Sequence, residues 1–187
     1  MTVLGASTHE AEERAIVAAL AEVRAAIPDL RIILAPRHPR RGDALAAAMA
    51  AGGIAPSRRS AGADAGASVL LADTLREMPL WYAAAGIVVT GGSFAPLGGH
   101  TPWEPAAHGC AILHGPHVAN FAEDYAQLDA AEAATAATAE GLAAAIRALV
   151  DNPDAAVAMG ARARAVLLAS AGDPAPLLGA IRDLAAR

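Results

Sequence analysis

Short apolar runs alternate with longer, partly polar stretches along most of the chain. The apolar runs predict β-strands over residues 2–6, 31–35, 57–60, 68–72, 86–89, 111–114 and 133–137, of which the third and the last are weak. Helices are predicted between them, over residues 7–27, 42–51, 75–85, 103–108, 121–130, 140–151, 152–170 and 174–187. Because strands that alternate with helices pair in parallel, we predict an open parallel α/β sheet with helices on both faces.

Several helix boundaries carry a recognisable signal. Ser7 and Glu10 match the S-x-x-E capping box of a helix start, and Pro28 ends the same helix. Pro79 falls in the first turns of the helix over residues 75–85, where proline is tolerated. The apolar residues available for the buried side of that helix are Leu75, Met78, Leu80 and Tyr82.

Length and composition favour one domain with an aliphatic core. A chain of 187 residues is large enough for one domain and short for two. Hydrophobic residues make up 55% of the chain but aromatic residues only 3%, so Leu, Ile, Val and Ala must fill the core. The net charge of −5 provides no basic face for a phosphate backbone, and nucleic acid is therefore not an expected partner.

Cysteine usage and hydropathy indicate a reducing, aqueous setting. Cys110 is the single cysteine, cannot form an internal disulfide, and precedes an apolar run as a small buried side chain would. No apolar run free of charge reaches the length of a membrane span, and the first residues are not a signal peptide. We expect a soluble fragment, and its start on a buried strand suggests that it is cut from a longer protein.

A glycine-rich loop follows the strand over residues 86–89. It contains Gly91, Gly92, Gly98 and Gly99, and a helix begins just beyond it at residues 102–104. Glycines let backbone N–H groups approach a ligand closely, and a helix start carries partial positive charge, so the unit predicts an anion site, with phosphate as the anion. The spacing matches neither the dinucleotide fingerprint nor the P-loop, and a plain turn remains the alternative.

Polar residues gather where the predicted strands end, which is where open α/β sheets bind ligands. Arg37, between two prolines, has a guanidinium suited to phosphate or carboxylate, whereas the alternative is a solvated arginine. Glu104 lies in the first turn of a helix and has two interpretations. It either interacts only with the helix dipole or accepts hydrogen bonds from a ribose diol, and Glu77 has the same ambiguity.

Four histidines, His100, His108, His114 and His117, are close together in the sequence. Their spacing matches no zinc motif, so we predict no metal site. A G-x-S-x-G nucleophile motif is also missing from the sequence, which nominates no catalytic nucleophile.

Short motifs occur along the chain in a fixed order. They are Ala6-Ser-Thr-His-Glu10, Pro36-Arg-His-Pro39, Asp73-Thr74 with Glu77, Gly91-Gly-Ser93, Gly98-Gly-His100 with Pro102, Glu104-Pro-Ala106, and Gly115-Pro-His117 with Asn120-Phe121. Together this ordered set resembles the C-terminal half of the 3-deoxy-D-manno-octulosonic acid (Kdo) transferases, bacterial glycosyltransferases of the GT-B fold. The resemblance covers nearly residues 3 to 165.

The resemblance implies a fold, a reaction and a location. It implies a Rossmann-like C-terminal domain that binds the donor CMP-Kdo, in an enzyme that transfers Kdo to a lipid A precursor without an obligatory metal or cofactor. The enzyme works at the cytoplasmic face of the bacterial inner membrane. The general base, the acceptor site and the membrane anchor belong to an N-terminal domain that this sequence does not contain, so residues 1–187 are expected to form a single CMP-sugar-binding domain without activity of its own.

The resemblance also implies which residues contact the donor. The nucleotide-binding positions would be Pro36, Arg37, Leu75, Arg76, Glu77, Thr101, Pro102, Trp103 and Glu104. Contacts to sugar or phosphate of lower rank would be Gly92, Ser93, His100, His117 and Asn120. Two positions depart from the family, which usually has glycine in place of Arg76 and asparagine in place of Thr101. Four interpretations are left open, namely a crowded site, an added phosphate contact, a changed donor preference and a divergent member of the family.

Two other functions remain as alternatives, namely another GT-B enzyme that uses a UDP-sugar, such as a transferase or epimerase, and a non-catalytic nucleotide-binding module. The last helix, over residues 174–187, is expected to cross to the N-terminal domain. Its apolar residues Leu177, Leu178, Ile181 and Leu184 would then be exposed here.

Overall fold

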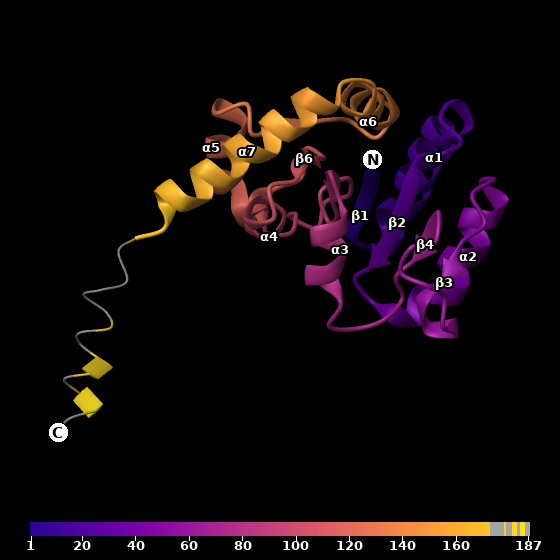
Figure 1. Cartoon of the computed structure of the whole chain (residues 1–187), viewed down its shortest axis with the longest axis horizontal. Coiled ribbons are helices and arrows are strands. Elements are labelled where there is room, and N and C mark those ends of the chain that lie inside the picture. Colours follow the sequence, from indigo (N-terminus) through magenta and orange to yellow (C-terminus); the bar gives the residue numbers. More distant parts are fainter. Residues whose placement is uncertain (173–177, 179–180, 183, 186–187) are drawn as a thin grey trace.

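The computed structural model describes residues 1–172, 178, 181–182 and 184–185, and its centre is one parallel sheet (Figure 1). The strands occur in the order β3-β4-β2-β1-β5-β6-β7, and all pairs are parallel. Their bounds are β1 Thr2–Thr8, β2 Arg31–Pro36, β3 Ser57–Arg58, β4 Val69–Leu71, β5 Ile87–Thr90, β6 Ala111–His114 and β7 Ala134–Ala136. The predicted fold class is confirmed.

The helices connect successive strands. Their bounds are α1 Glu10–Ala26, α2 Gly42–Ala51, α3 Met78–Ala84, α4 Trp103–Ala107, α5 Ala122–Ala130, α6 Leu142–Asp151 and α7 Pro153–Ser170, with short 3₁₀ turns η1 Pro39–Arg41, η2 Arg59–Ala61 and η3 Ala119–Phe121. No helix in the part of the chain that the structure describes is long and apolar enough to span a bilayer.

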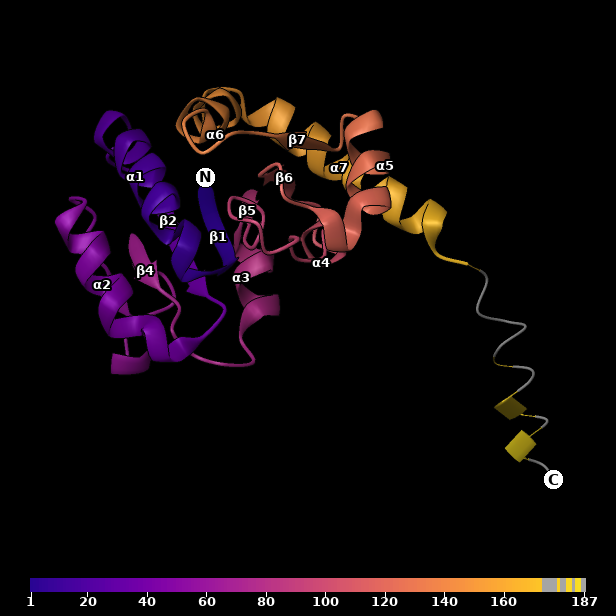
Figure 2. The ribbon, with the colours of Figure 1, turned by 180° about the vertical axis from the view of Figure 1, so that it is seen from behind.

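Alternation of side chains along each strand divides the core between the two faces of the sheet. Val3 and Ile32 point to the face covered by α1, α2 and α6, whereas Leu4 and Ile33 point to the face covered by α3. On this second face α4, α5 and α7 pack against Ile112 at the β6 end of the sheet. Figures 1 and 2 show these helices on either side of the strands. The alanine-rich helices thus build the aliphatic core that the composition predicts.

Up to Ser170, the predicted strands and helices agree with the structure apart from two helix starts. The capping box does not involve Ser7 and Glu10, because β1 continues to Thr8 and the box is made by His9 and Glu12. Helix α3 begins at Met78 rather than at Leu75. Leu75 therefore lies before the helix and is 69% exposed, and Leu80 lies in α3 but on its outer side, at 48% exposed, so neither belongs to a buried helix face as predicted.

The predicted last helix, over residues 174–187, lies largely outside the described residues, and so does Leu177. Leu178, Ile181 and Leu184 are described, and their exposed fractions are 51%, 52% and 69%. These three apolar side chains are therefore not part of the core of the domain.

Candidate functional site

A cleft of about 290 Å³ lies at the carboxyl ends of the central strands. Strand β1 pairs with β2 on one side and with β5 on the other, so the chain reverses its direction of winding here, and open α/β sheets bind ligands at such a point. The carboxyl ends of β1 and β2, the segments that follow β2, β4 and β5, and the first turns of α3 and α4 line the cleft. The lining residues are Ser7, Ala35, Pro36, Arg37, Ala72, Thr74, Leu75, Arg76, Met78, His100, Thr101 and Glu104. Six of the nine predicted nucleotide-binding positions are in this set.

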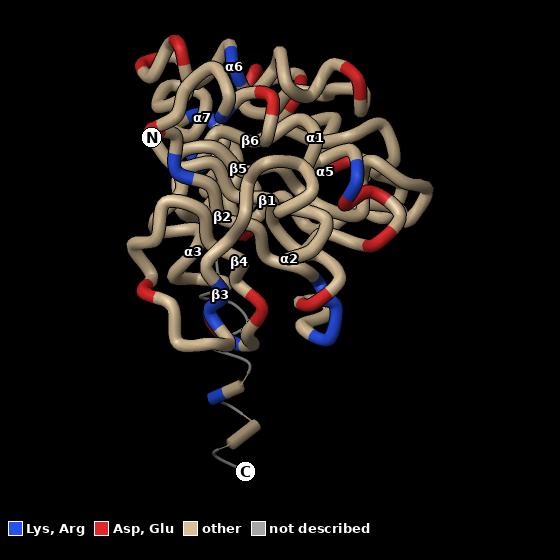
Figure 3. The backbone as a smooth tube through the Cα atoms, turned by 90° about the vertical axis from the view of Figure 1, so that its right-hand side faces the viewer, with Lys and Arg blue, Asp and Glu red and all other residues tan. Residues whose placement is uncertain are grey.

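Two arginines at the cleft differ from the arginines around it. Among the described residues, ion pairs with carboxylates engage Arg41, Arg58, Arg59 and Arg147, but neither Arg37 nor Arg76. The backbone N–H of Arg37 donates to the carbonyl of Thr8 at 2.9 Å, which fixes the loop after β2 against the end of β1. Acidic and basic positions are interspersed along the backbone (Figure 3), and the cleft lining has these two arginines together with the acidic Glu104.

Glu104 lines the cleft from the first turn of α4. The hydroxyl of Tyr82, a buried residue of α3, donates to Glu104 Oε2 at 3.3 Å. Burial raises the pKa of Tyr82, and the neighbouring Glu104 raises it further, so this phenol keeps its proton and remains a donor. The hydrogen bond from Tyr82 thus fixes one carboxylate oxygen of Glu104. The residue is exposed, so its carboxylate can also accept hydrogen bonds from a ligand.

A pair of histidines borders the same cleft. His9 Nε2 and His100 Nε2 lie 2.9 Å apart, and the two rings stack with their centroids 5.0 Å apart. Burial lowers the pKa of His100, and the adjacent His9 and Arg37 lower it further. Burial likewise lowers the pKa of His9. Both rings therefore favour the neutral form, in which one nitrogen of the pair donates and the other accepts.

The glycine loop does not offer the anion site that the sequence predicts there. Gly92 N–H donates to Glu12 Oε1 at 2.5 Å, and Phe94 N–H donates to Glu12 Oε2 at 3.0 Å. The Glu12 residue is 1% exposed, so its carboxylate is an internal anion that already occupies these donors. Glycine is required at residue 91 because a Cβ there would lie 2.4 Å from the carbonyl oxygen of Ser7.

The five lower-ranked positions fall in three places. His100 is in the cleft. Ser93 and Gly92 are buried, and the Ser93 hydroxyl donates to the carbonyl of Thr90 at 2.5 Å and accepts from Gly115 N–H at 2.8 Å. His117 and Asn120 line a neighbouring hollow of about 570 Å³, together with Pro96, Leu97, Gly98, Pro116, Val118, Ala119 and Ala122. Only His100, His117 and Asn120 are thus placed for direct contact with a ligand.

Three predicted nucleotide-binding residues lie outside the cleft lining. Pro102 is buried at the start of α4, and Trp103 faces a different hollow beside α5 and α7. The Glu77 carboxylate is bound by Arg59, with Nη2 at 2.8 Å, and by the hydroxyl of Thr74. The bonds from Arg59 and Thr74 lower the pKa of Glu77, which holds the turn over residues 74–77 and does not itself face the cleft.

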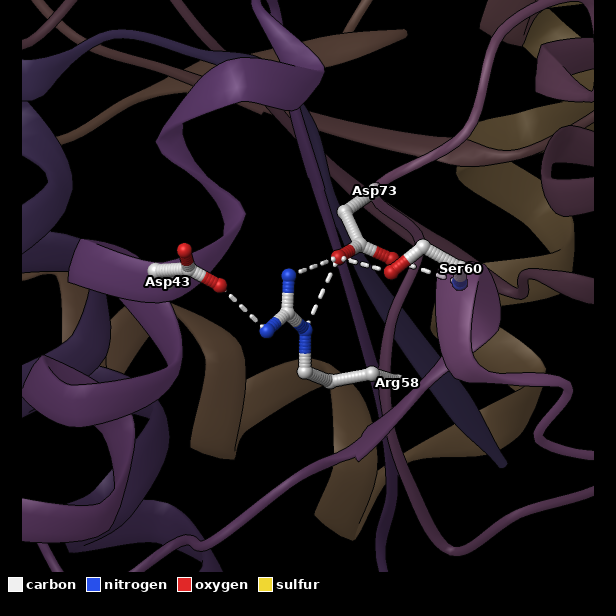
Figure 4. Close-up of polar contacts among 4 residues, drawn as sticks. All are labelled: Asp43, Arg58, Ser60 and Asp73. Atoms are coloured by element: carbon white, nitrogen blue, oxygen red, sulfur yellow. Dashed lines mark hydrogen bonds and ion pairs between the residues drawn. The ribbon is translucent and has the colours of Figure 1, made fainter.

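A second group of charged residues lies beside this turn, at the end of β4 (Figure 4). We call Asp43, Arg58, Ser60 and Asp73 the closed network. Asp73 accepts from Ser60 N–H at 2.9 Å, from the Ser60 hydroxyl at 2.7 Å, and from Arg58 Nε and Nη2 at 2.9 and 2.7 Å. Burial by itself raises the pKa of Asp73, but the bonds from Ser60 and Arg58 outweigh it and hold the pKa below its ordinary value.

Sequence reasoning assigned no role to Ser7 in the cleft lining, or to His9 and Glu12 beside it. Glu12 looked like an ordinary acidic residue of a first helical turn, and no local signal shows that the glycine loop, eighty residues later, binds it. His9 belongs to the site because it pairs with His100, a residue far from it in the sequence. Ser7 has a φ of 55°, which the run of apolar strand residues around it does not indicate.

The four histidines of the sequence analysis do not form one cluster. His114 is buried, with Nδ1 2.8 Å from the carbonyl of Gly115 and Nε2 3.1 Å from Asp129, and the His108 ring stacks near Tyr82. Within the described ranges no group of three or more His, Cys, Asp or Glu side chains is arranged to hold a metal ion. Cys110 is buried, and burial raises the pKa of its thiol to about 11.

Comparison with known proteins finds this fold in a glycosyltransferase, although no family model matches the chain. The C-terminal domain of a group 1 family glycosyl transferase (LpcC) from Francisella tularensis superposes with a TM-score of 0.65 at 13% identity, over 90% of this chain and 85% of that one. The fold is thus the Rossmann-like fold of the C-terminal domain of a GT-B glycosyltransferase.

Two closer similarities identify the family. The C-terminal CMP-Kdo binding domain of WaaA from Acinetobacter baumannii is 33% identical with a TM-score of 0.82, over 89% of each chain. The 3-deoxy-D-manno-octulosonic acid transferase of Bordetella pertussis is 41% identical over 95% of this chain and 43% of its own length. The chain therefore belongs to the Kdo transferase family and spans less than half the length of that relative.

Proposed function

We propose that the cleft binds the CMP part of CMP-Kdo, and that the whole protein is a transferase that moves Kdo from this donor to a lipid A precursor in lipopolysaccharide biosynthesis. The observation that carries the proposal is that Arg37 and Glu104, which are far apart in the sequence, line one cleft at the carboxyl end of the central strands. A cation for phosphate and a carboxylate for a ribose diol are the two groups that a nucleotide site needs.

Each part of the nucleotide has matching residues. Arg37 is the cation for the phosphate, and Glu104, oriented by Tyr82, accepts hydrogen bonds from the ribose hydroxyls. Leu75 and Pro36 offer apolar contact to the base, which explains why a leucine that is 69% exposed stands at the cleft. Thr101 lines the cleft as well, and its Oγ1 accepts from Trp103 N–H at 3.3 Å, so Trp103 and Pro102 support the site through the start of α4.

The sugar of the donor is proposed to extend toward the glycine loop. His100 faces the cleft, and His117 and Asn120 line the adjoining hollow, so these three side chains are the proposed sugar contacts. Gly92 and Ser93 contribute by shaping the loop. Glu77 holds the turn that presents Leu75 and Arg76.

In the proposed reaction a hydroxyl of the acceptor attacks the anomeric carbon of Kdo, and the bond from that carbon to the phosphate oxygen breaks. The electron pair stays on the phosphate, so CMP leaves with one more negative charge than it had in the donor. Arg37 stabilises this developing charge. The proton of the acceptor hydroxyl passes to a general base in the N-terminal domain, and this domain alone is therefore not expected to turn over.

The acceptor and the location of the enzyme belong to the whole protein. We propose that the lipid A precursor binds to the N-terminal domain, that this domain anchors the enzyme at the cytoplasmic face of the bacterial inner membrane, and that the segment over residues 174–187 packs against it. The exposed Leu178, Ile181 and Leu184 support this last contact. The proposal requires the donor as substrate and no separate cofactor.

Calorimetric titration of this chain with CMP and with UDP tests the proposal. We expect saturable binding that prefers CMP, and a loss of at least tenfold in affinity in Arg37→Ala and in Glu104→Ala, as expected when a charge-assisted hydrogen bond is removed. Arg40→Ala and Glu123→Ala are matched controls. Arg40 is exposed in the same loop as Arg37, and Glu123 is exposed in the first turn of α5 as Glu104 is in the first turn of α4.

A preference for UDP would favour a UDP-sugar enzyme in place of the Kdo transferase. No binding of either nucleotide, or equal binding by the wild type and both cleft variants, would refute the cleft as the donor site.

A further inference from the structure

The backbone at Arg76 has an unusual conformation for an arginine. Its φ is 68°, in the left-handed region that glycine adopts easily and that other residues avoid because their Cβ crowds the neighbouring carbonyl. Among the described residues only Ser7, Arg76 and Glu132 combine a side chain with a positive φ. Ser7 and Arg76 both line the cleft, and backbone strain of this kind concentrates at functional sites.

The contacts that fix this conformation are not made by the Arg76 side chain. On one side of the turn Arg59 and Thr74 hold Glu77, and on the other side Asp73 is held by Ser60 and Arg58. The turn between residues 73 and 77 is thereby anchored at both ends. Arg76, the left-handed residue, therefore lies in a turn that is held at both ends, and it lines the cleft.

The charge at Arg76 is left without a partner although arginines near it are paired. Arg58 and Arg59 each bind a carboxylate in the same part of the molecule. Arg76 makes no hydrogen bond or ion pair with any described residue, and it is exposed at the cleft that also contains Arg37. An arginine held at a strained position, with its guanidinium free and directed to a cleft, has the properties of an anion contact.

We propose that Arg76 is a second phosphate contact that this chain adds to its donor site, so that Arg37 and Arg76 together bind the anionic group of the nucleotide. The inference rests on the proposed function of the cleft. Arg76 then makes the site more selective for the nucleotide over the nucleoside that lacks the phosphate, although the backbone conformation at this position favours glycine.

Titration of wild type and Arg76→Gly with CMP and with cytidine tests this role, because cytidine lacks only the phosphate. We expect Arg76→Gly to lose roughly tenfold in CMP affinity, as for a charge-assisted hydrogen bond, and to bind cytidine as the wild type does. Arg76→Asn should give the same result, since asparagine tolerates the left-handed conformation without the charge. The unfolding midpoint of Arg76→Gly should rise by about 1–3 °C, because glycine relieves the strain.

Glu132→Gly is the matched control. Glu132 has a φ of 52° and is exposed at the end of α5, away from the cleft lining. The same exchange there should raise the midpoint similarly and leave CMP affinity unchanged. Equal CMP binding by both Arg76 variants would overturn the inference, because the arginine would then make no phosphate contact. Tighter binding would also overturn it, because the arginine would then crowd the site. Either result would leave the proposed function standing. Equal losses for CMP and cytidine would also overturn it, whereas a wild type that binds no CMP would refute the proposed function itself.

Discussion

At the carboxyl ends of the strands, charged side chains are paired in the closed network, whereas two arginines in the cleft have no carboxylate partner among the described residues. In the closed network at the end of β4, Asp73 is bound by four donor contacts from two residues and only 1% of its side chain is exposed. A short distance along the edge, the cleft leaves Arg37 and Arg76 without carboxylate partners. Paired charges hold the backbone in place, and unpaired charges remain available for a ligand. In the proposed function Arg58 holds the closed network, whereas Arg37 and Arg76 bind the donor in the cleft.

The largest loss of stability is expected when the acceptor at the centre of the closed network is removed. Asp73→Ala leaves the amide and the hydroxyl of Ser60 without their acceptor, and we expect it to lower the free energy of unfolding by about 2–3 kcal/mol. Denaturant titration measures the change.

Asp43→Ala provides the control within the same network. Its side chain is 92% exposed and binds the same Arg58, so its loss should change stability far less. If the two variants were equally stable, Asp73 would not be the centre of the network.

The glycine loop can be tested in the same way, because Glu12 closes it as Asp73 closes the network. In Glu12→Gln one oxygen becomes an NH₂ group that cannot accept from Gly92 or Phe94, and a decrease of about 2 kcal/mol in the free energy of unfolding is expected. Glu10→Gln, whose side chain is 75% exposed in the same first turn, should be close to the wild type.

A full restoration of stability in Glu12→Gln by added phosphate or CMP would contradict this assignment, because the loop would then be an external anion site after all. The expected result is that phosphate does not rescue the variant.

The smallest expected effect concerns the histidine pair beside the open cleft. The folded state lowers the pKa of His9 and His100, so below pH 6.5 the unfolded chain binds protons more readily than the folded one. The free energy of unfolding should therefore fall as the pH falls below 6.5. Burial is the main cause of the lowered pKa of both rings, and the charges of Arg37 and, for His9, His38 act in the same direction, whereas the charge of Glu12 opposes them.

Thermal unfolding between pH 5 and pH 7.5 measures this slope. His100→Gln should flatten it, whereas His117→Gln, which changes an exposed histidine of the neighbouring hollow, should not. Identical slopes in all three proteins would show that the pair does not control the acid response.

The fold was predictable because its signals are local. Apolar runs such as residues 31–35 and 111–114 mark strands by themselves, and Gly52 and Pro153 mark helix boundaries. Helix α3 was predicted to start too early because Leu75 is apolar, and sequence alone does not tell an apolar residue in a helix from one exposed at a cleft.

The site was predictable only in part. Arg37 and Glu104 were indicated by their places after a strand and at a helix start, which are local features. The pairing of Glu77 with Arg59 and of Glu12 with the glycine loop depends on contacts between distant segments. Whether a charged residue is neutralised within the protein or left for a ligand is decided by the tertiary structure.

The central position of β1 has a consequence for how the chain reaches its fold. One edge of β1 pairs with β2 soon after, but the other edge pairs with β5, which begins only at Ile87. At roughly 5–20 residues per second, a ribosome needs several seconds to synthesise the intervening chain. During that time the second edge of an apolar strand is unpaired and prone to aggregation, so folding of this domain is expected to be slow and to depend on protection of the nascent β1–β2 unit.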